Sequence, residues 1–359
     1  MMRSEIYLRW ILPALVVAGM GNLWSAEEGT MPKVKVENVR RVFHNGEHNA
    51  FTDLIRWHDR FWLTFRSCPD GHMVSSTASV IVLSSEDAQT WREEFRFSVP
   101  KRDTRDPHFL SFQDKLFVFT GTWYSGEGKL PMDQYDINKQ LGFAVWTEDG
   151  KVWQGPRQME GTYGHYIWKA AERDGMAYLC GRRKAGYSEN ESGAGGSRVM
   201  EGALLVSEDG FNWTFRSLFQ ETMGNETAFL FQSDGSLLAL SRESSDEAQI
   251  ATSVAPFVEW KRERLPEHIG GPLLARWGDK LVIGGRRNTP EGKRTALYWL
   301  DGTKLIPFAQ LPSDGDNSYP GFVDLGGGKG LVSWYSSHEK DADGKTITAI
   351  YLADLEMEP

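Results

Sequence analysis

A glutamate and an arginine bracket a short apolar hairpin in the middle of the chain. The stretch 225–242, NETAFLFQSDGSLLALSR, contains an apolar run, a Ser-Asp-Gly turn and a second apolar run. Because the two strands of a hairpin run back alongside each other, we expect Glu226 and Arg242 to emerge at the same edge of a sheet. We therefore expect a binding or catalytic site at that edge.

Arginines end several other hairpins of the same kind. A guanidinium group can bind two oxygens of a carboxylate at once, so arginines gathered at one edge predict an anionic ligand. The alternative is that some of them form structural ion pairs with the carboxylates that open the hairpins. The arginines that end hairpins are Arg66, Arg182, Arg183, Arg242, Arg286 and Arg287.

Two aspartates open the first and second hairpins. Asp53 and Asp106 could form a carboxylate pair on adjacent blades, suited to acid and base roles. They could equally orient Arg66 and Arg105. The residues that open hairpins are Asp53, Asp106, Trp168, Lys169, Glu226 and Tyr319.

Aromatic and histidine residues near these ends could also contact a ligand. Trp168 and His165 could stack on a sugar ring, although most of the 14 tryptophans are expected to pack in the core. In the loop after the first hairpin, His72 could protonate a leaving group near neutral pH, or it could be an ordinary loop histidine. Asp70 is the other candidate acid in this loop.

The pattern of an apolar run, a turn and a second apolar run occurs six times, about every 45 to 60 residues. This spacing is the length of one four-stranded propeller blade. No amphipathic helix separates the copies. The sequence therefore predicts an all-β fold, a six-bladed β-propeller of four-stranded antiparallel blades. An early strand at 33–43 could pair with the last strand at 347–355 and close the ring without free edges.

A second repeated motif follows the first three hairpins in the sequence. The pattern Ser/Thr-x-Asp-x-x-x-Trp occurs in 85–91, 147–153 and 207–213. Its aspartate and hydroxyl can accept backbone N–H groups and fix a tight turn, while its tryptophan packs between blades. The motif resembles the Asp box of sialidases and related propellers. That resemblance implies a structural role, in the turn between the third and fourth strands of a blade.

Over nearly all of the mature chain, the repeat pattern resembles an exo-sialidase of the retaining type. In that family a glutamate opens the fourth-blade hairpin and an arginine closes it, and Glu226 and Arg242 match those positions and their separation here. A second arginine closes the fifth and a tyrosine opens the sixth, which matches Arg286 and Tyr319. The resemblance implies that Tyr319 is the nucleophile, that Glu226 is its base, and that the arginines hold a substrate carboxylate. A neutral phenol approaches an anionic sugar with less repulsion than a carboxylate would.

Two positions depart from the family pattern. An arginine opens the first hairpin in the family, whereas this chain has Asn49-Ala50-Phe51-Thr52-Asp53 there. The family's acid/base aspartate has no clear counterpart in 70–76, which leaves Asp70 and His72 as candidates. Alternatives to a sialidase are therefore a glycosidase or polysaccharide lyase for another acidic sugar, such as a uronate, and a non-catalytic glycan-binding propeller.

Composition narrows the class of protein. The 359 residues carry a net charge of −9 with both signs interspersed, which does not suit a nucleic-acid-binding surface. We find no Cys/His metal set and no phosphate-binding loop, so we expect no metal and no cofactor.

Residues 1–26 are typical of an export signal, which predicts a secreted or periplasmic protein with one propeller domain at 27–359. We expect a monomer that contacts a glycan substrate and, after signal cleavage, no membrane.

Overall fold

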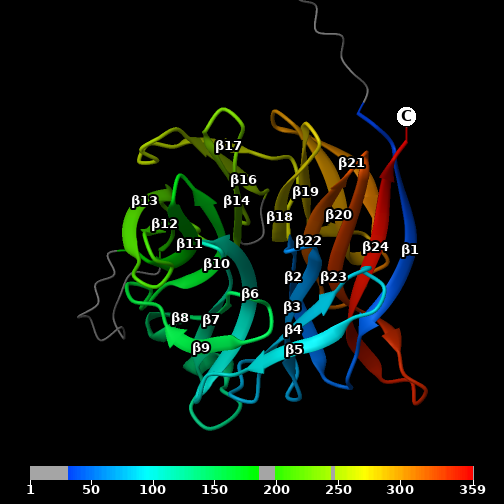
Figure 1. Ribbon diagram of the computed structural model, residues 1–359, viewed down its shortest axis with the longest axis horizontal. Coiled ribbons are helices and arrows are strands. Elements are labelled where there is room, and N and C mark those ends of the chain that lie inside the picture. The colour runs from blue at the N-terminus through cyan, green and yellow to red at the C-terminus, as the bar shows by residue number, and fades with distance from the viewer. Residues whose placement is uncertain (1–30, 186–198, 244–246, 359) are drawn as a thin grey trace, which may run out of the picture. The chain divides into compact units, whose positions relative to one another are not determined.

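The computed structural model describes residues 31–185, 199–243 and 247–358, and it shows an all-β propeller of four-stranded antiparallel blades (Figure 1). The predicted export signal at 1–26 lies outside the described residues. Within the described ranges, no helix is long and apolar enough to cross a membrane.

Four blades form separate sheets in which the strands pair in chain order. The second blade also carries two short 3-10 helices, η1 (Met132–Gln134) and η2 (Ile137–Lys139). The strands of these sheets are β6 (Arg102–Phe112), β7 (Lys115–Tyr124), β8 (Leu141–Thr147) and β9 (Trp153–Gln158); β10 (Tyr166–Arg173), β11 (Met176–Lys184), β12 (Met200–Ser207) and β13 (Thr214–Gln220); β14 (Thr227–Phe231), β15 (Leu237–Ser241), β16 (Gln249–Ser253) and β17 (Lys261–Arg264); β18 (Gly270–Trp277), β19 (Lys280–Thr289), β20 (Gly292–Asp301) and β21 (Lys304–Gln310).

The remaining strands form one eight-stranded sheet, in which two four-stranded sets join through a single parallel bridge between His48 and Thr348. In the set that contains β22, β23 and β24, strand β1 pairs antiparallel with β24 along most of the length of β1. This pairing confirms the predicted closure of 33–43 onto the last strand. The strands are β2 (His48–Trp57), β3 (Arg60–Cys68), β4 (Ser79–Ser85) and β5 (Arg92–Phe97) in one set, and β22 (Asn317–Gly326), β23 (Lys329–Lys340), β24 (Thr346–Met357) and β1 (Val34–Phe43) in the other.

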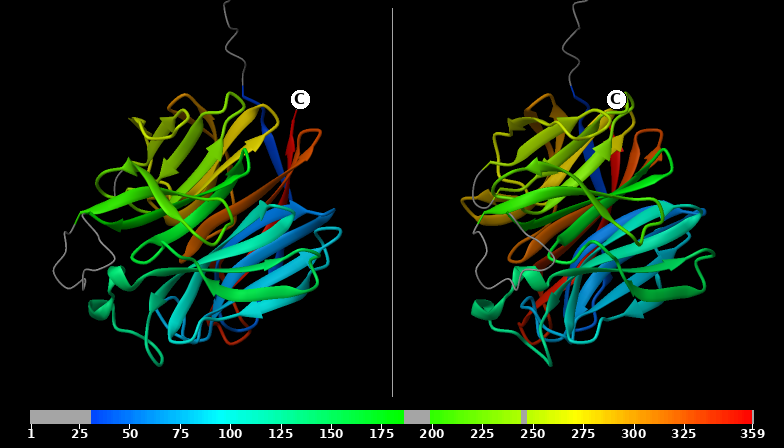
Figure 2. Two further views of the ribbon diagram at one scale, coloured as in Figure 1. Left: turned by 60° about the vertical axis from the view of Figure 1, so that its left-hand side comes forward. Right: turned by 90° about the vertical axis from the view of Figure 1, so that its left-hand side faces the viewer.

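The first strand of each hairpin lies innermost. Strand β2 contacts β6 and β22, β10 contacts β6 and β14, and β18 contacts β14 and β22, so these strands surround a common centre (Figure 1; Figure 2 shows the same sheets from two other directions). Buried and partly buried aromatic residues fill the space between neighbouring sheets. For example, Trp153 of β9 stacks on Phe95 of β5, with ring centroids 5.4 Å apart.

The repeated aspartates hold turns between the third and fourth strands. Oδ1 of Asp87 accepts two backbone N–H groups, from Gln89 and Thr90, each at 2.8 Å. Asp149 and Asp209 accept the equivalent pairs at the same distance. These bonds confirm the predicted structural role of the motif, and none of the three aspartates lines the pocket described below.

A one-residue β-bulge interrupts the innermost strand in five of the hairpins described. In each case the register between the first and second strands shifts by one residue, as between Ala50 and Asp53 in β2. A bulge bends the strand and redirects the side chain of the extra residue. The residues at this position are Phe51, Asp106, Trp168, Gly271 and Tyr319, of which all but Trp168 have positive φ.

Candidate functional site

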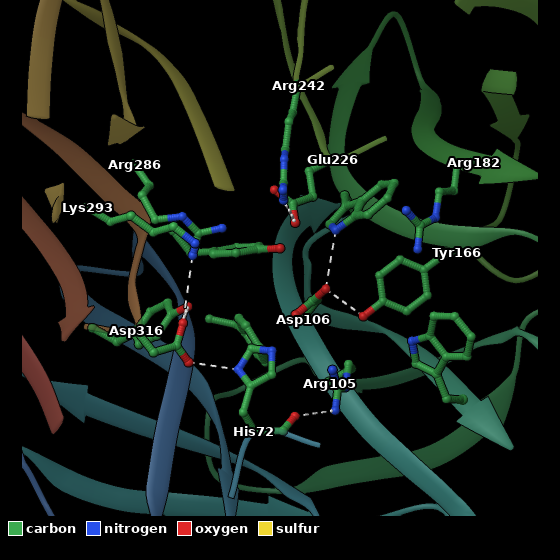
Figure 3. Close-up of a pocket in the computed structure, with 15 residues that line it drawn as sticks. His72, Arg105, Asp106, Tyr166, Arg182, Glu226, Arg242, Arg286, Lys293 and Asp316 are labelled. Atoms are coloured by element: carbon green, nitrogen blue, oxygen red, sulfur yellow. Dashed lines mark hydrogen bonds and ion pairs between the residues drawn. The ribbon is translucent and has the colours of Figure 1, made fainter. Parts of the chain in front are cut away.

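A pocket of about 370 Å³ lies where the innermost strands meet (Figure 3). Four of the five bulge residues line it, so the repeated bulge is the device that turns side chains into the pocket. The lining residues are Phe51, His72, Arg105, Asp106, Trp123, Tyr166, Trp168, Arg182, Glu226, Arg242, Arg286, Lys293, Asp316, Tyr319 and Tyr335.

Glu226 and Arg242 form an ion pair in the wall of the pocket. Nη1 of Arg242 donates to Oε1 of Glu226 at 2.8 Å, and the backbone N–H of Gly271 donates to Oε2 at 2.7 Å. Burial alone would raise the pKa of Glu226, but Arg242 and Arg286 outweigh it and lower that pKa to about 2. Glu226 is therefore ionised across the physiological pH range.

Tyr319 is packed tightly against its surroundings. Its ring meets Phe51 at a centroid separation of 5.0 Å, and only 7% of the residue is exposed. Gly271 has φ +56°, and a Cβ built there would lie 2.4 Å from Cδ2 of Tyr319, so only glycine leaves room for this ring. Burial, followed by the charges of Asp106 and Glu226, raises the pKa of the Tyr319 phenol well above its ordinary value. The free protein thus holds Tyr319 as a neutral phenol.

Asp316 collects hydrogen bonds from two histidines and a tyrosine. Its Oδ2 lies 2.7 Å from Nδ1 of His72 and 2.9 Å from Nε2 of His48, and its Oδ1 accepts from the Tyr335 hydroxyl at 2.9 Å. Nη1 of Arg286 is 3.7 Å from the same Oδ1. Burial opposes ionisation of Asp316, but its contacts with the two histidines hold its pKa far below the ordinary value.

The same three side chains have the types and spacing of a metal site. One ligand atom each from His48, His72 and Asp316 lies within 4.8 Å of the others. Two imidazoles and a carboxylate are suitable ligands for Zn²⁺ and similar divalent ions. However, the histidine nitrogens already contact Asp316, and the Arg286 guanidinium stands beside it. A cation would have to replace those contacts and tolerate the nearby positive charge.

Asp106 lies almost completely buried beside two aromatic residues. Its Oδ2 accepts from the Tyr166 hydroxyl at 2.5 Å and from Nε1 of Trp168 at 3.3 Å, and its Oδ1 has no hydrogen-bond partner. Burial raises the pKa of Asp106 to about 6, although Arg105 and the Tyr166 hydroxyl act in the opposite direction. Asp106 therefore changes charge within an accessible pH range, while Glu226 does not.

In addition to Arg182, seven of the residues singled out from the sequence line this one pocket. They come from different blades and are separated by up to 247 residues in the chain. Their convergence means that the positions chosen by hairpin register face a common space. They are Tyr319, Glu226, Arg242, Arg286, His72, Asp106 and Trp168.

Asp53 and Arg66 do not reach the pocket. The bulge in β2 places Phe51 at the mouth and moves Asp53 deeper, where it pairs with Lys169 and accepts from the backbone N–H of Phe109. The expected pairing of Asp53 with Asp106 is therefore wrong. Arg66 is fully buried in a two-bond ion pair with Asp103, at 2.9 Å for each bond, so it serves the fold.

Asp70 and His165 also lie outside the pocket. Asp70 is exposed and accepts from the hydroxyls of Ser75 and Thr77, which hold the loop in shape. His165 precedes β10 and is buried, with Nδ1 3.2 Å from the Tyr163 carbonyl. Burial lowers the pKa of His165 to about 4. Neither residue can contact a ligand in this pocket without rearrangement.

Several lining residues were not predicted from the sequence. Tyr335 pairs with Ser318 in the same register in which Arg286 pairs with Gly270, so a strict alignment of hairpin ends could have found it. Asp316 lies three residues before Tyr319 in the sequence, but no motif around it indicates a site residue. Lys293 comes from the outer strand β20, and no sequence pattern points to it.

Comparison with solved structures supports the fold. A protein of unknown function from Dyadobacter fermentans superimposes with a TM-score of 0.73 at 19% identity, over 91% of this chain and 100% of that one. A Trypanosoma rangeli sialidase gives 0.63 at 14% identity, over 90% of this chain and 60% of that chain. The endosialidase of phage phi92 gives 0.63 at 10% identity, over 90% and 69%.

At these identities the likeness is one of fold, a β-propeller that sialidases also use. This chain spans about 60% of the length of the trypanosomal sialidase. No model of a known protein family matches the chain, and no curated protein matches its sequence. Function must therefore be argued from the pocket itself.

Proposed function

We propose that the protein is a secreted, sialidase-like exo-glycosidase that removes a terminal acidic sugar from glycans. The observation that carries the proposal is the convergence of Tyr319, Glu226, Arg242 and Arg286 in one pocket. We count the eight-stranded sheet as two blades, which gives the six-bladed arrangement of the proposed scaffold.

In the proposed reaction, Tyr319 attacks the anomeric carbon and its proton passes to Glu226. The glycosidic C–O bond breaks, and the leaving oxygen takes a proton from Nε2 of His72, whose Nδ1 is held by Asp316. Water then attacks the same carbon and gives a proton to His72, while Tyr319 recovers its own from Glu226. Arg242 and Arg286 hold the substrate carboxylate throughout.

One feature of the pocket favours a second candidate. Phe51 occupies the mouth position of the first hairpin, where the sialidase pattern has an arginine. Without that arginine the carboxylate-binding set of the sialidase pattern is incomplete, so a different acidic sugar, such as a uronate, is a candidate ligand. A glycosidase or polysaccharide lyase for such a sugar is therefore the alternative, followed by a glycan-binding propeller without turnover.

The proposal is tested by incubating the purified protein with a fluorogenic α-sialoside beside a panel of uronides and neutral glycosides. Release from the sialoside alone supports the sialidase assignment. Release from a uronide, or a product with near-ultraviolet absorbance from a new double bond, replaces it with the glycosidase or lyase alternative. Saturable glycan binding with no release from any substrate points to a binding protein.

A further inference from the structure

Arg182 stands on the wall of the pocket opposite Arg286 (Figure 3). Its Nη1 donates to Oδ1 of Asn225 at 3.3 Å, and its Nε has no hydrogen-bond partner. Among the residues that the structure describes, no carboxylate forms an ion pair with it. Arg182 is thus a largely buried cation that no carboxylate contacts directly. Glu226 and Asp106 act on it only at longer range, and they do not overcome the effect of burial on its pKa.

The other arginines of the pocket are balanced. Arg105 pairs with Asp103, Arg242 with Glu226, and Arg286 lies 3.7 Å from Asp316. Burial lowers the pKa of Arg182 below its ordinary value, whereas neighbouring acidic groups overcome burial and raise that of Arg286. The lack of a direct carboxylate partner sets Arg182 apart from Arg242 and Arg286, which are assigned to the sugar carboxylate.

Aromatic rings hold the Arg182 guanidinium in place. It lies 5.5 Å from the ring centroids of both Tyr166 and Trp168. Such contacts fix the plane of a guanidinium group but leave its N–H groups unused. A group held in this way is ready to bind an anion at small entropic cost.

The charge of the whole pocket points the same way. Five lysine or arginine side chains and three carboxylates line it, in a chain whose net charge is −9. A single ligand carboxylate at Arg242 and Arg286 would leave the wall at Arg182 uncompensated. Buried charges are usually paired, so a second negative group is the natural complement.

We infer that Arg182 binds a second anionic group, so that the preferred ligand carries two negative charges. One is the sugar carboxylate at Arg242 and Arg286, and the other is a carboxylate or a sulfate at Arg182. This inference rests on the proposed function and deepens it by naming the substrate class. The second charge could sit on the same sugar or on the next one.

Calorimetric titration of the Tyr319→Phe variant, which is proposed to bind without turnover, tests the inference. Three probes are compared: N-acetylneuraminic acid, its 8-O-sulfate, and the α2,8-linked disaccharide. If the substrate panel selects uronides, glucuronic acid, its 2-O-sulfate and a di-uronide replace them. A charge-assisted hydrogen bond to the second group should tighten binding of one doubly charged probe about tenfold to a hundredfold. The probe that gains identifies where that charge sits.

Adding Arg182→Gln should abolish this gain while changing the affinity for the singly charged sugar less than about threefold. Arg182→Lys should keep most of the gain, which shows that charge is what matters. Arg183→Gln is the matched control, because Arg183 pairs with Glu201 at 2.9 Å and lies outside the pocket.

Three outcomes would overturn the inference. In the first, neither doubly charged probe binds more tightly than the singly charged sugar. In the second, Arg182→Gln weakens all probes equally. In either case the proposed function stands if the singly charged sugar still binds through Arg286, as shown by loss of binding in Arg286→Gln. In the third outcome, no acidic sugar binds at all, and the proposed function then fails together with the inference.

Discussion

Arg242 contacts Glu226 through both main chain and side chain: its backbone N–H donates to the Glu226 carbonyl at 2.9 Å, and its Nη1 donates to Oε1 at 2.8 Å. The hairpin between them therefore fixes the carboxylate and its counter-ion in one unit. The backbone N–H of Gly271, from the next blade, completes the arrangement. The Glu226 carboxylate is held ionised and oriented before any ligand arrives.

Glu226→Gln should lower kcat by about a hundredfold to ten-thousandfold, because the proposed proton acceptor is removed. KM should stay the same or fall, since Arg242 is then free to bind the substrate carboxylate. Steady-state kinetics on the hydrolysed substrate measure both constants. Glu201→Gln, which breaks the ion pair with Arg183 outside the pocket, is the control. An unchanged kcat would rule Glu226 out as the base.

Tyr319→Phe should reduce turnover at least about a thousandfold, because the phenol oxygen forms the proposed covalent bond. Binding of the acidic sugar should persist, since Arg242 and Arg286 are untouched. Tyr178→Phe is the matched control, because Tyr178 packs against Phe231 and Phe257 away from the pocket. Full activity of the Tyr319 variant would end this mechanism.

His72→Gln should slow cleavage of an alkyl glycoside by about a hundredfold to ten-thousandfold. The loss should be small with an activated aryl glycoside, whose leaving oxygen needs no proton. Asp316→Asn should show the same dependence more weakly, because Asp316 orients the ring. Asp70→Asn is the control. If it produces the leaving-group dependence and His72→Gln does not, Asp70 is the acid.

Asp106 should make folding stability fall as pH rises from about 4 to about 6. The folded protein raises the pKa of Asp106 from 3.8 to about 6, so over this range it holds a proton that the unfolded chain has released. Asp106→Asn cannot ionise and lacks this loss. The free energy of unfolding of Asp106→Asn minus that of the native protein should therefore increase with pH, by on the order of 2 kcal/mol. Denaturant titrations at several pH values measure it; a constant difference would contradict the raised pKa.

Zn²⁺ should inhibit the proposed hydrolysis, and a chelator should reverse the inhibition. The ion would bind His48, His72 and Asp316, which present ligand atoms within 4.8 Å of one another, and would occupy the proposed proton donor. Treatment of the purified protein with the chelator alone should leave activity unchanged. If chelation instead removes activity and Zn²⁺ restores it, the cluster holds a required metal and His72 is a ligand.

The sequence alone determined the features that depend on local pairing. A hairpin brings its ends together whatever the rest of the chain does, so the pairing of Glu226 with Arg242 followed from a single stretch. The Asp-containing turns are equally local, because each aspartate accepts N–H groups two and three residues ahead. Repetition of these two patterns was enough to predict the propeller.

Which of the candidate site residues face one another depends on the tertiary fold and could not be read from the sequence. A single extra residue in β2 exchanged Asp53 for Phe51 at the mouth, and a bulge of that kind has no clear sequence signature. The Asp316 contacts with His48 and His72 join residues from opposite ends of the chain, so they exist only when the ring closes. Hydrogen bonding within a hairpin or a tight turn is set by residues close in sequence, whereas the charge balance of a pocket is set by neighbours in space.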